Sequence, residues 1–272
     1  MKSHLPETEQ AHVVPSACLE SFAASRRFPV AVSVFILITC LVSGAAARGD
    51  KKDKEKPAAL AIDSGSFGVF IKGQRVATET FTIHQQSTTS FIKSQLKEEH
   101  GPASQTSDLE ITSSGELLRY EWTQASAGSL TVLPNNEFLI EKITSAAFSK
   151  PAEQSFLMPT TSVILDNNFF VHREVLAWRY LASDCKPEAA GWKCQRVPGD
   201  FGVLVPQDRM SLHIRVELVG AEKVTIRGAE RELLRLNLKG ENVDWALWVD
   251  DHDQFKLMRV AIPADDTEVV RD

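Results

Sequence analysis

Apolar and polar residues alternate with a period of two through most of this 272-residue chain, and this pattern restricts the fold more than any other feature. The clearest stretch covers residues 210–218, where Met, Leu, Ile, Val and Leu are interleaved with Ser, His, Arg and Glu. Successive side chains of a strand point to opposite faces, so such a segment buries one face and leaves the other in water. This pattern is typical of antiparallel sheets.

Similar segments occur along the whole chain. They cover residues 67–71, 76–85, 118–122, 130–140, 234–238, 243–249 and 255–262, and in one of them Leu118, Tyr120 and Trp122 alternate with Arg119 and Glu121. Turn-forming residues separate many of them, such as Lys-Gly-Gln at 72–74 and Pro-Asn-Asn at 134–136. Roughly ten strands at these spacings predict a mostly β fold, a curved antiparallel sheet or an open β-barrel.

One segment has helical spacing instead. In residues 169–181, Phe169, Leu176 and Tyr180 share one side, while other apolar residues occupy most of the remaining circumference. Residues 166–168, Asp-Asn-Asn, offer candidate N-caps. A helix that is apolar on most sides is expected to be buried, so we predict that it lies against the concave face of the sheet.

The N-terminal region resembles a secretory signal. Arg26 and Arg27 precede an uncharged, mostly apolar run at residues 29–47 that ends in three alanines. We predict cleavage after Ala47, or after Ala45, and export to the periplasm or the medium. Two alternatives stay open: residues 30–47 as an uncleaved membrane anchor, which would be the protein's only contact with the membrane, and lipidation at Cys40. The acidic residues before Arg26 are unusual for a signal, and they suggest a true start nearer Ala23.

These patterns divide the chain into three parts. Residues 1–47 form an N-terminal extension and signal peptide, residues 48–63 a charged linker, and residues 64–272 a single β-rich domain with its helix near 169–181. The last part is long enough to bury a substantial core.

The exported part would keep two cysteines, Cys185 and Cys194. An even count in an exported protein predicts a disulfide, which would stabilise the fold by about 2–3 kcal/mol. The alternative is a two-thiol metal site, but no further ligands occur at zinc-like spacing.

The charge balance argues against nucleic acid as a partner. The formal net charge is −6, and no cluster of Lys and Arg outside the linker would form a basic face.

No catalytic motif is evident, so we expect no enzyme activity and no cofactor. Ser-x-x-Lys occurs at Ser90–Lys93 and Ser94–Lys97, but on a strand residues three apart face opposite sides, and no companion motif follows.

Residues 250–253, Asp-Asp-His-Asp, lie between strands and are interpreted as a turn, with a weak divalent-cation site as the alternative. His172 is either a satisfied histidine of the helix or a polar group in a ligand cavity.

The opening GSFGVFIKGQRVATETFTI and the closing VDWALWVDDHDQFKLMRVAIP carry a resemblance to known families. These hairpins are similar to the first and last hairpins of exported bacterial families of unknown function. The whole layout resembles the periplasmic lipoprotein-carrier families, in which a curved sheet wraps a helix. The resemblance implies a periplasmic half-barrel that binds an apolar ligand, and it carries over no functional residue.

Together these observations predict a non-enzymatic exported protein that binds an apolar small molecule, a lipid or another envelope component between sheet and helix. The residues expected to line the cavity are aromatic or apolar, with one histidine: Trp122, Phe170, His172, Trp178, Leu181 and Trp245. Trp248 lies three residues from Trp245, so we expect it on the outer face as an exposed contact. The alternative function is a structural or protein-interaction module of the cell envelope, with a filled core.

Overall fold

The computed structural model describes residues 59–101, 104–145, 150–189 and 191–272. The signal peptide, its cleavage sites, Cys40 and residues 48–58 of the linker lie outside the described residues. Strand β1 begins at Leu60, inside the range predicted to be linker. Among the described residues, no helix is both long enough and apolar enough to cross a bilayer.

The described part of the chain is mostly β, with one α-helix, as the alternation predicts. The strands of the first half are β1 (Leu60–Ile71), β2 (Gln74–Gln86), β3 (Thr89–Glu98), β4 (Gln105–Thr112), β5 (Leu117–Gln124), β6 (Gly128–Asn135), β7 (Phe138–Thr144), β8 (Ala152–Leu157) and β9 (Val163–Ile164). After helix α1 (Val171–Asp184) come β10 (Cys185–Glu188), β11 (Gly191–Cys194), β12 (Gly199–Val205), β13 (Met210–Ile226), β14 (Ala229–Gly240), β15 (Val243–Asp250), β16 (Lys256–Ile262), a 3₁₀ turn (Pro263–Asp265) and β17 (Thr267–Arg271).

Fifteen of these strands form one sheet, more than the roughly ten expected. Its order is β8-β7-β6-β5-β4-β3-β2-β1-β17-β16-β15-β14-β13-β12-β9, and every pairing is antiparallel except that of β9 with β12. The last strand, β17, lies between β1 and β16, which joins the two halves of the sheet. The sheet is curved and open rather than closed into a barrel, so the predicted fold class is confirmed.

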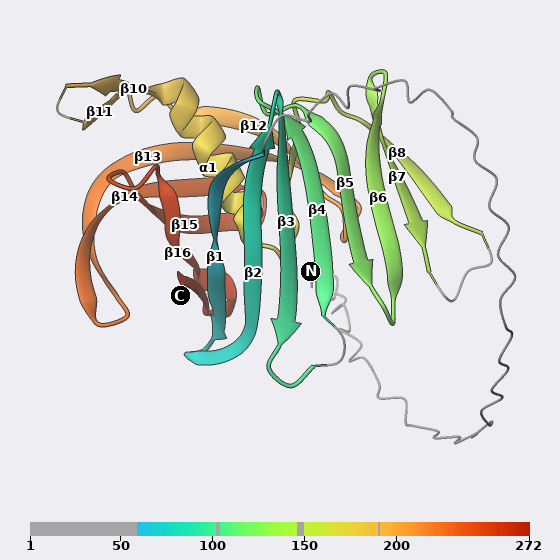
Figure 1. Ribbon diagram of the computed structural model, residues 1–272, viewed down its shortest axis with the longest axis horizontal. Coiled ribbons are helices and arrows are strands. Elements are labelled where there is room, and N and C mark those ends of the chain that lie inside the picture. Colours follow the sequence, from blue (N-terminus) through green and yellow to red (C-terminus); the bar gives the residue numbers. More distant parts are fainter. Residues whose placement is uncertain (1–58, 102–103, 146–149, 190) are drawn as a thin grey trace, which may run out of the picture. The chain divides into compact units, whose positions relative to one another are not determined.

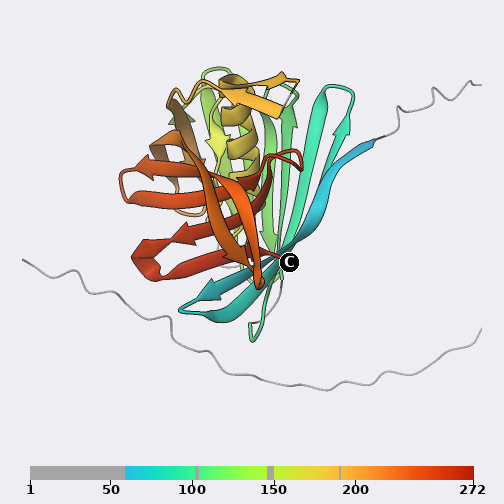
Figure 2. The ribbon, with the colours of Figure 1, turned by 90° about the vertical axis from the view of Figure 1, so that its left-hand side faces the viewer.

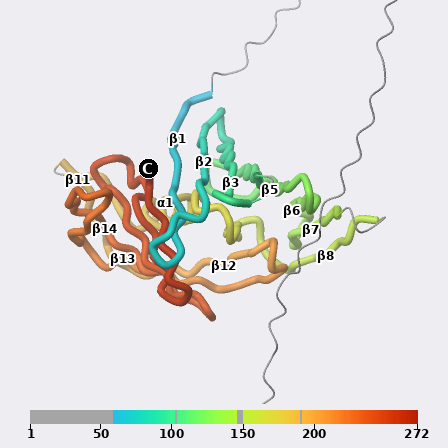
Figure 3. The backbone as a smooth tube through the Cα atoms, turned by 90° about the horizontal axis from the view of Figure 1, so that it is seen from below, coloured from blue at the N-terminus to red at the C-terminus, as the bar shows by residue number. Residues whose placement is uncertain are grey.

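Helix α1 lies inside the curve. In Figure 1, β2–β6 stand upright while β13–β15 run across them, and the helix lies between these two sets. The view in Figure 2 shows the same arrangement from the side, and Figure 3 shows it from below. The segment before β9 also reaches the first half of the sheet, where the Leu117 amide donates to the Thr160 carbonyl at 2.7 Å. The helix is therefore enclosed by strands distant from one another in sequence.

The N-terminus of α1 is capped by a residue of the sheet. Oε2 of Glu79, on β2, accepts a hydrogen bond from the Phe170 amide at 2.6 Å, and Oε1 accepts one from the Val171 amide at 3.3 Å. The predicted caps at residues 166–168 were wrong: the N-cap position is Phe170, which provides no side-chain hydrogen bond. Asp166 instead binds the Asn168 amide at 2.7 Å in the preceding turn. The oxygens of a buried carboxyl group therefore satisfy amides that the helix leaves unpaired.

A β-bulge reverses the two faces of β13. The register with β14 shifts between Leu218 and Gly220, where Gly220 has φ +141°. Before the bulge Leu218 packs into the main core, and after it Val224 and Ile226 pack into a second cluster with Trp248. The expectation that Trp248 is exposed was wrong, because it is only 6% exposed in this cluster.

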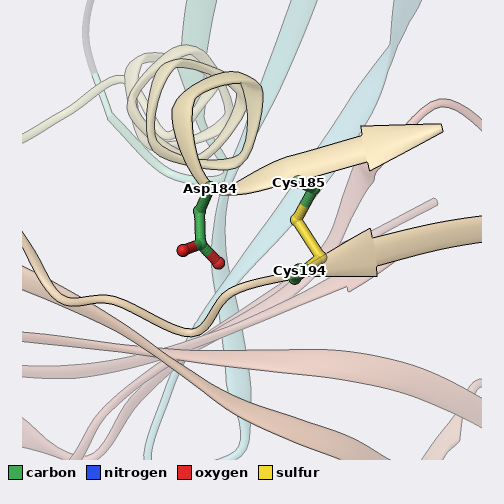
Figure 4. A group of neighbouring side chains, drawn as sticks. All are labelled: Asp184, Cys185 and Cys194. Atoms are coloured by element: carbon green, nitrogen blue, oxygen red, sulfur yellow. A yellow bond between two sulfur atoms is a disulfide. The ribbon is translucent and has the colours of Figure 1, made fainter.

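The β10–β11 hairpin follows the helix directly. Cys185 and Cys194 pair across it and form the predicted disulfide (Figure 4). The Asp184 carboxylate beside it accepts hydrogen bonds from the amides of Arg196 and Val197, both at 2.9 Å. The disulfide thus links the two strands of the hairpin where they begin and end, and the Asp184 hydrogen bonds attach the segment after β11 to the end of the helix.

Candidate functional site

One face of α1 is incompletely covered by the sheet. Val175, Trp178, Arg179, Ala182 and Ser183 are partly or fully exposed, whereas all the other residues of α1 are buried. Their spacing of three and four residues places them on one side of the helix. This stripe forms one wall of a pocket of about 520 Å³.

The opposite wall comes from the concave face of the sheet and from β9. Its apolar residues are Leu109 and Ile111 of β4, Leu117 of β5, and Val163 and Ile164 of β9. The volume lies within the range of roughly 300–1,000 Å³ that is typical of small-molecule sites.

The rim and the floor of the pocket differ in polarity. Ser113, Ser114 and Ser183 are exposed at the rim, while Leu109, Leu117 and Ile164 in the floor are each 2% exposed. An apolar floor with a hydroxyl-rich mouth suits a molecule whose larger part is hydrocarbon.

Among the described residues that line the pocket, Arg179 alone is charged. Its guanidinium makes one long hydrogen bond, 3.4 Å from Nη1 to the Gly115 carbonyl, and lies 5.7 Å from the Phe201 ring centre. Partial burial lowers the pKa of Arg179, and the charge of Glu116 raises it in return. Gly115, with φ +85°, makes room for this side chain, because a Cβ there would lie 3.3 Å from Cδ of Arg179.

Ser162 also lines the pocket, and it is shared with a neighbouring pocket beside Gly202. Ser162 is 3% exposed, and within the described structure its hydroxyl has no hydrogen-bond partner. An unpaired buried hydroxyl is unfavourable, so this position suits an occupant that can accept or donate a hydrogen bond.

The other end of the helix carries a buried polar network. The Arg173 guanidinium donates to the backbone carbonyls of Asp166 and Phe169 and lies over the rings of Phe170 and Trp245, at 4.6 and 4.9 Å. Asp166 accepts hydrogen bonds from the Tyr120 hydroxyl and the Gln207 amide. These contacts anchor the helix and lie away from the pocket lining.

His172 belongs to the same buried region. Nδ1 accepts a hydrogen bond from the Asp166 amide at 3.3 Å, and Nε2 lies 3.4 Å from the Ser107 hydroxyl. Burial, followed by the neighbouring Arg173 charge, lowers the pKa of His172 to about 3. The ring is therefore neutral and linked at both nitrogens.

The structure brings only one of the predicted lining residues into the pocket, namely Trp178, whose indole also donates to the Phe255 carbonyl at 2.9 Å. Phe170, His172 and Leu181 lie on other sides of the helix in the core, and Trp122 and Trp245 pack against that core from the sheet. Contact of these five residues with a ligand stays a prediction, and they do not line this pocket.

Sequence reasoning missed Arg179 and Ala182 as lining residues. Counting four residues on from Val175 and from Trp178 would have found them, because residues at that spacing share one side of the helix. No comparable signal marks Leu109, Leu117 or Ser162, which reach the pocket only through the curvature of the sheet.

The two Ser-x-x-Lys segments lie on β3, as predicted. Ser94 is buried and donates to Glu79 at 2.6 Å, whereas Lys93 and Lys97 are exposed on the opposite face. The lysines therefore do not reach the serine hydroxyls.

In the part of the chain that the structure describes, two groups of side chains have metal-ligand chemistry. Asp184 lies beside Cys185 and Cys194, but the disulfide leaves no free thiol for a metal (Figure 4). Asp250, Asp251 and His252 gather in the β15–β16 turn, with His252 Nδ1 2.9 Å from Asp251. This second group is open to solvent, and polar residues are expected at such a turn.

Comparison with protein-family models, curated proteins and solved structures finds no match for this chain.

Proposed function

We propose that this protein binds an apolar ligand in the pocket between α1 and the sheet, without catalysing a reaction on it. The observation that carries the proposal is the helix stripe of Val175, Trp178 and Ala182: Val175 and Trp178 pack at the edge of the core, yet the stripe leaves a pocket of about 520 Å³ between itself and an apolar floor. An apolar surface of this kind gains free energy when a hydrocarbon chain displaces water from it. A filled core would have left no such space.

Export to the periplasm or the medium fits this proposal. Free hydrocarbon chains occur near the cell envelope, and a disulfide such as Cys185–Cys194 persists in oxidising compartments. The ligand would then be a lipid or another apolar component of the envelope.

The first test uses the protein as it is purified from the periplasm of an expressing bacterium. Native mass spectrometry with lipid extraction is expected to release apolar species on denaturation, and calorimetric titration with dodecanol is expected to show binding.

Ala182→Phe would place a ring at the mouth of the pocket without disturbing buried residues, because Ala182 is exposed. We expect it to weaken dodecanol binding about tenfold or more.

The matched control is Ala229→Phe, at an exposed alanine of the β13–β14 hairpin. It is expected to bind dodecanol like the parent. The proposal fails if the parent binds no chain, or if Ala182→Phe and Ala229→Phe bind equally well.

A second candidate is a protein-interaction module of the cell envelope. It is favoured by the free edge strand β8, where Leu157 pairs with Phe138 of β7 and the two side chains are 74% and 42% exposed. Exposed apolar residues at a sheet edge are typical of interaction surfaces. If Leu157→Asp abolished an association seen by native mass spectrometry while no ligand was released, this candidate would be preferred.

A further inference from the structure

The two arginines of α1 have opposite surroundings. Arg173 is fully buried with two backbone carbonyls as acceptors, and the charges of Asp166 and Glu79 lie close enough to raise its pKa against the lowering effect of burial. Arg179 is partly buried in the pocket wall, and among the described residues no carboxylate forms an ion pair with it. Among the described residues, its guanidinium donates one hydrogen bond, a long one to the Gly115 carbonyl.

The Arg179 guanidinium is partly desolvated, and it lacks both a carboxylate partner and enough hydrogen-bond acceptors. Burial removes water from the charge, and five N–H donors need oxygen acceptors. Carboxylates and phosphates satisfy this need best, because their oxygens match the planar fork of the guanidinium. The negative charge of Glu116 offsets only part of the cost, since Glu116 lies at the exposed turn and forms no ion pair with Arg179.

We infer that the ligand is a single-chain amphiphile with an anionic oxyacid headgroup, which Arg179 binds while the hydrocarbon chain enters the floor of the pocket. This inference rests on the proposed function and adds the class of ligand to it. At the rim the Ser113 hydroxyl provides a further donor for headgroup oxygens, whereas the Ser183 hydroxyl already donates to the Tyr180 carbonyl at 2.7 Å. A neutral chain would leave the guanidinium with the long bond to the Gly115 carbonyl and no anionic partner.

The test compares three probes that share one chain: dodecanoate, dodecyl phosphate and dodecanol, titrated calorimetrically into the full-length protein below their micelle concentrations. At least one anion is expected to bind about tenfold or more tightly than dodecanol, which corresponds to about 1.4 kcal/mol. A preference for dodecanoate identifies a carboxylate headgroup, and a preference for dodecyl phosphate identifies a phosphate. This comparison needs no variant, so it stands even where a substitution impairs folding.

Arg179→Gln is expected to abolish the preference for the anions over dodecanol, while Arg179→Lys keeps part of the preference. The control is Arg215→Gln, at an exposed arginine of β13, which is expected to behave like the parent.

Two kinds of failure are distinguishable. If dodecanol binds the parent as tightly as both anions, or if the preference survives Arg179→Gln, the headgroup inference is overturned and the pocket remains a site for apolar chains. If no probe binds the parent, or if Ala182→Phe binds every probe as tightly as the parent, the proposed function falls together with the inference.

Discussion

Glu79 connects the sheet to the helix through a single carboxyl group. Burial raises the pKa of Glu79 to about 7, although hydrogen bonds from Ser94, Phe170 and Val171 and the charge of Arg173 all act to lower it. The folded protein therefore holds a proton on this group at pH values where the unfolded chain, with an ordinary value of 4.5, has released it.

This raised pKa makes stability depend on pH. The contribution of Glu79 to the free energy of unfolding is complete below pH 4.5 and is lost as the pH rises through about 7. Glu79→Gln, which cannot ionise, should flatten the pH dependence over this interval, as measured by urea unfolding at a series of pH values. Glu98→Gln, at an exposed position, controls for the loss of one negative charge. An unchanged slope for Glu79→Gln would contradict this account.

Irregularities in strands decide which side chains enter the core. In β5 the alternation predicts that Leu118 shares a face with Tyr120, but the register with β4 shifts there. Leu117 is consequently buried and lines the pocket, while Leu118 is 39% exposed. A single extra residue in a strand exchanges its two faces, and alternation alone does not reveal it.

The bulge in β13 can be tested through Gly220. Its φ of +141° is one that residues with a side chain rarely adopt, so Gly220→Ala should lower the free energy of unfolding by about 1–3 kcal/mol. Because the bulge directs Val224 and Ile226 onto Trp248, the substitution should also make tryptophan emission more accessible to a soluble quencher.

Gly202→Ala is the matched control for this experiment. Gly202 lies in β12, and an added Cβ would meet its nearest neighbour, the Ser162 hydroxyl, at an ordinary 3.6 Å. Its effect on stability should stay within about 1 kcal/mol. Equal stability of both variants would show that the bulge does not need a glycine.

The two halves of the sheet meet at the chain's first and last described strands. On β17, Arg271 Nη2 binds the two carboxylate oxygens of Asp63, on β1, at 2.8 and 2.7 Å. Nη1 lies 3.5 Å from Glu174 of the helix, so one buried arginine links both halves of the sheet to α1. Removing one member of such a buried group leaves the others as uncompensated charges or unpaired polar groups.

Arg271→Met should therefore lower the free energy of unfolding by about 3–5 kcal/mol, measured by urea unfolding at neutral pH. Adding Asp63→Asn should recover part of this loss, because the remaining carboxylate is neutralised. Arg75→Met, which removes a partly exposed pair with Asp272, is the control and should cost no more than about 1 kcal/mol. If the two arginine variants lose equal stability, Arg271 does not have this joining role.

The fold class and the position of the helix could be predicted from the sequence because both depend on local periodicity. A period of two marks strands with one buried face, and the apolar circumference of residues 169–181 marks a helix that must be enclosed. The disulfide followed from the number of cysteines and the expected compartment. Trp178 was identified because a large apolar side chain on an enclosed helix must contact either core or ligand.

Only the tertiary structure decided three features of the site and its support. Glu79 caps the helix, Leu117 is buried in place of Leu118, and Arg179 has no ion-pair partner among the described residues. Each depends on residues distant in sequence: Glu79 caps a helix 91 residues away, and the pocket requires β4, β5, β9 and α1 together. The sequence determined which faces are apolar, because that depends on spacing along one element. Which apolar face stays uncovered depends on the curvature and register of the whole sheet, and these result from packing between elements.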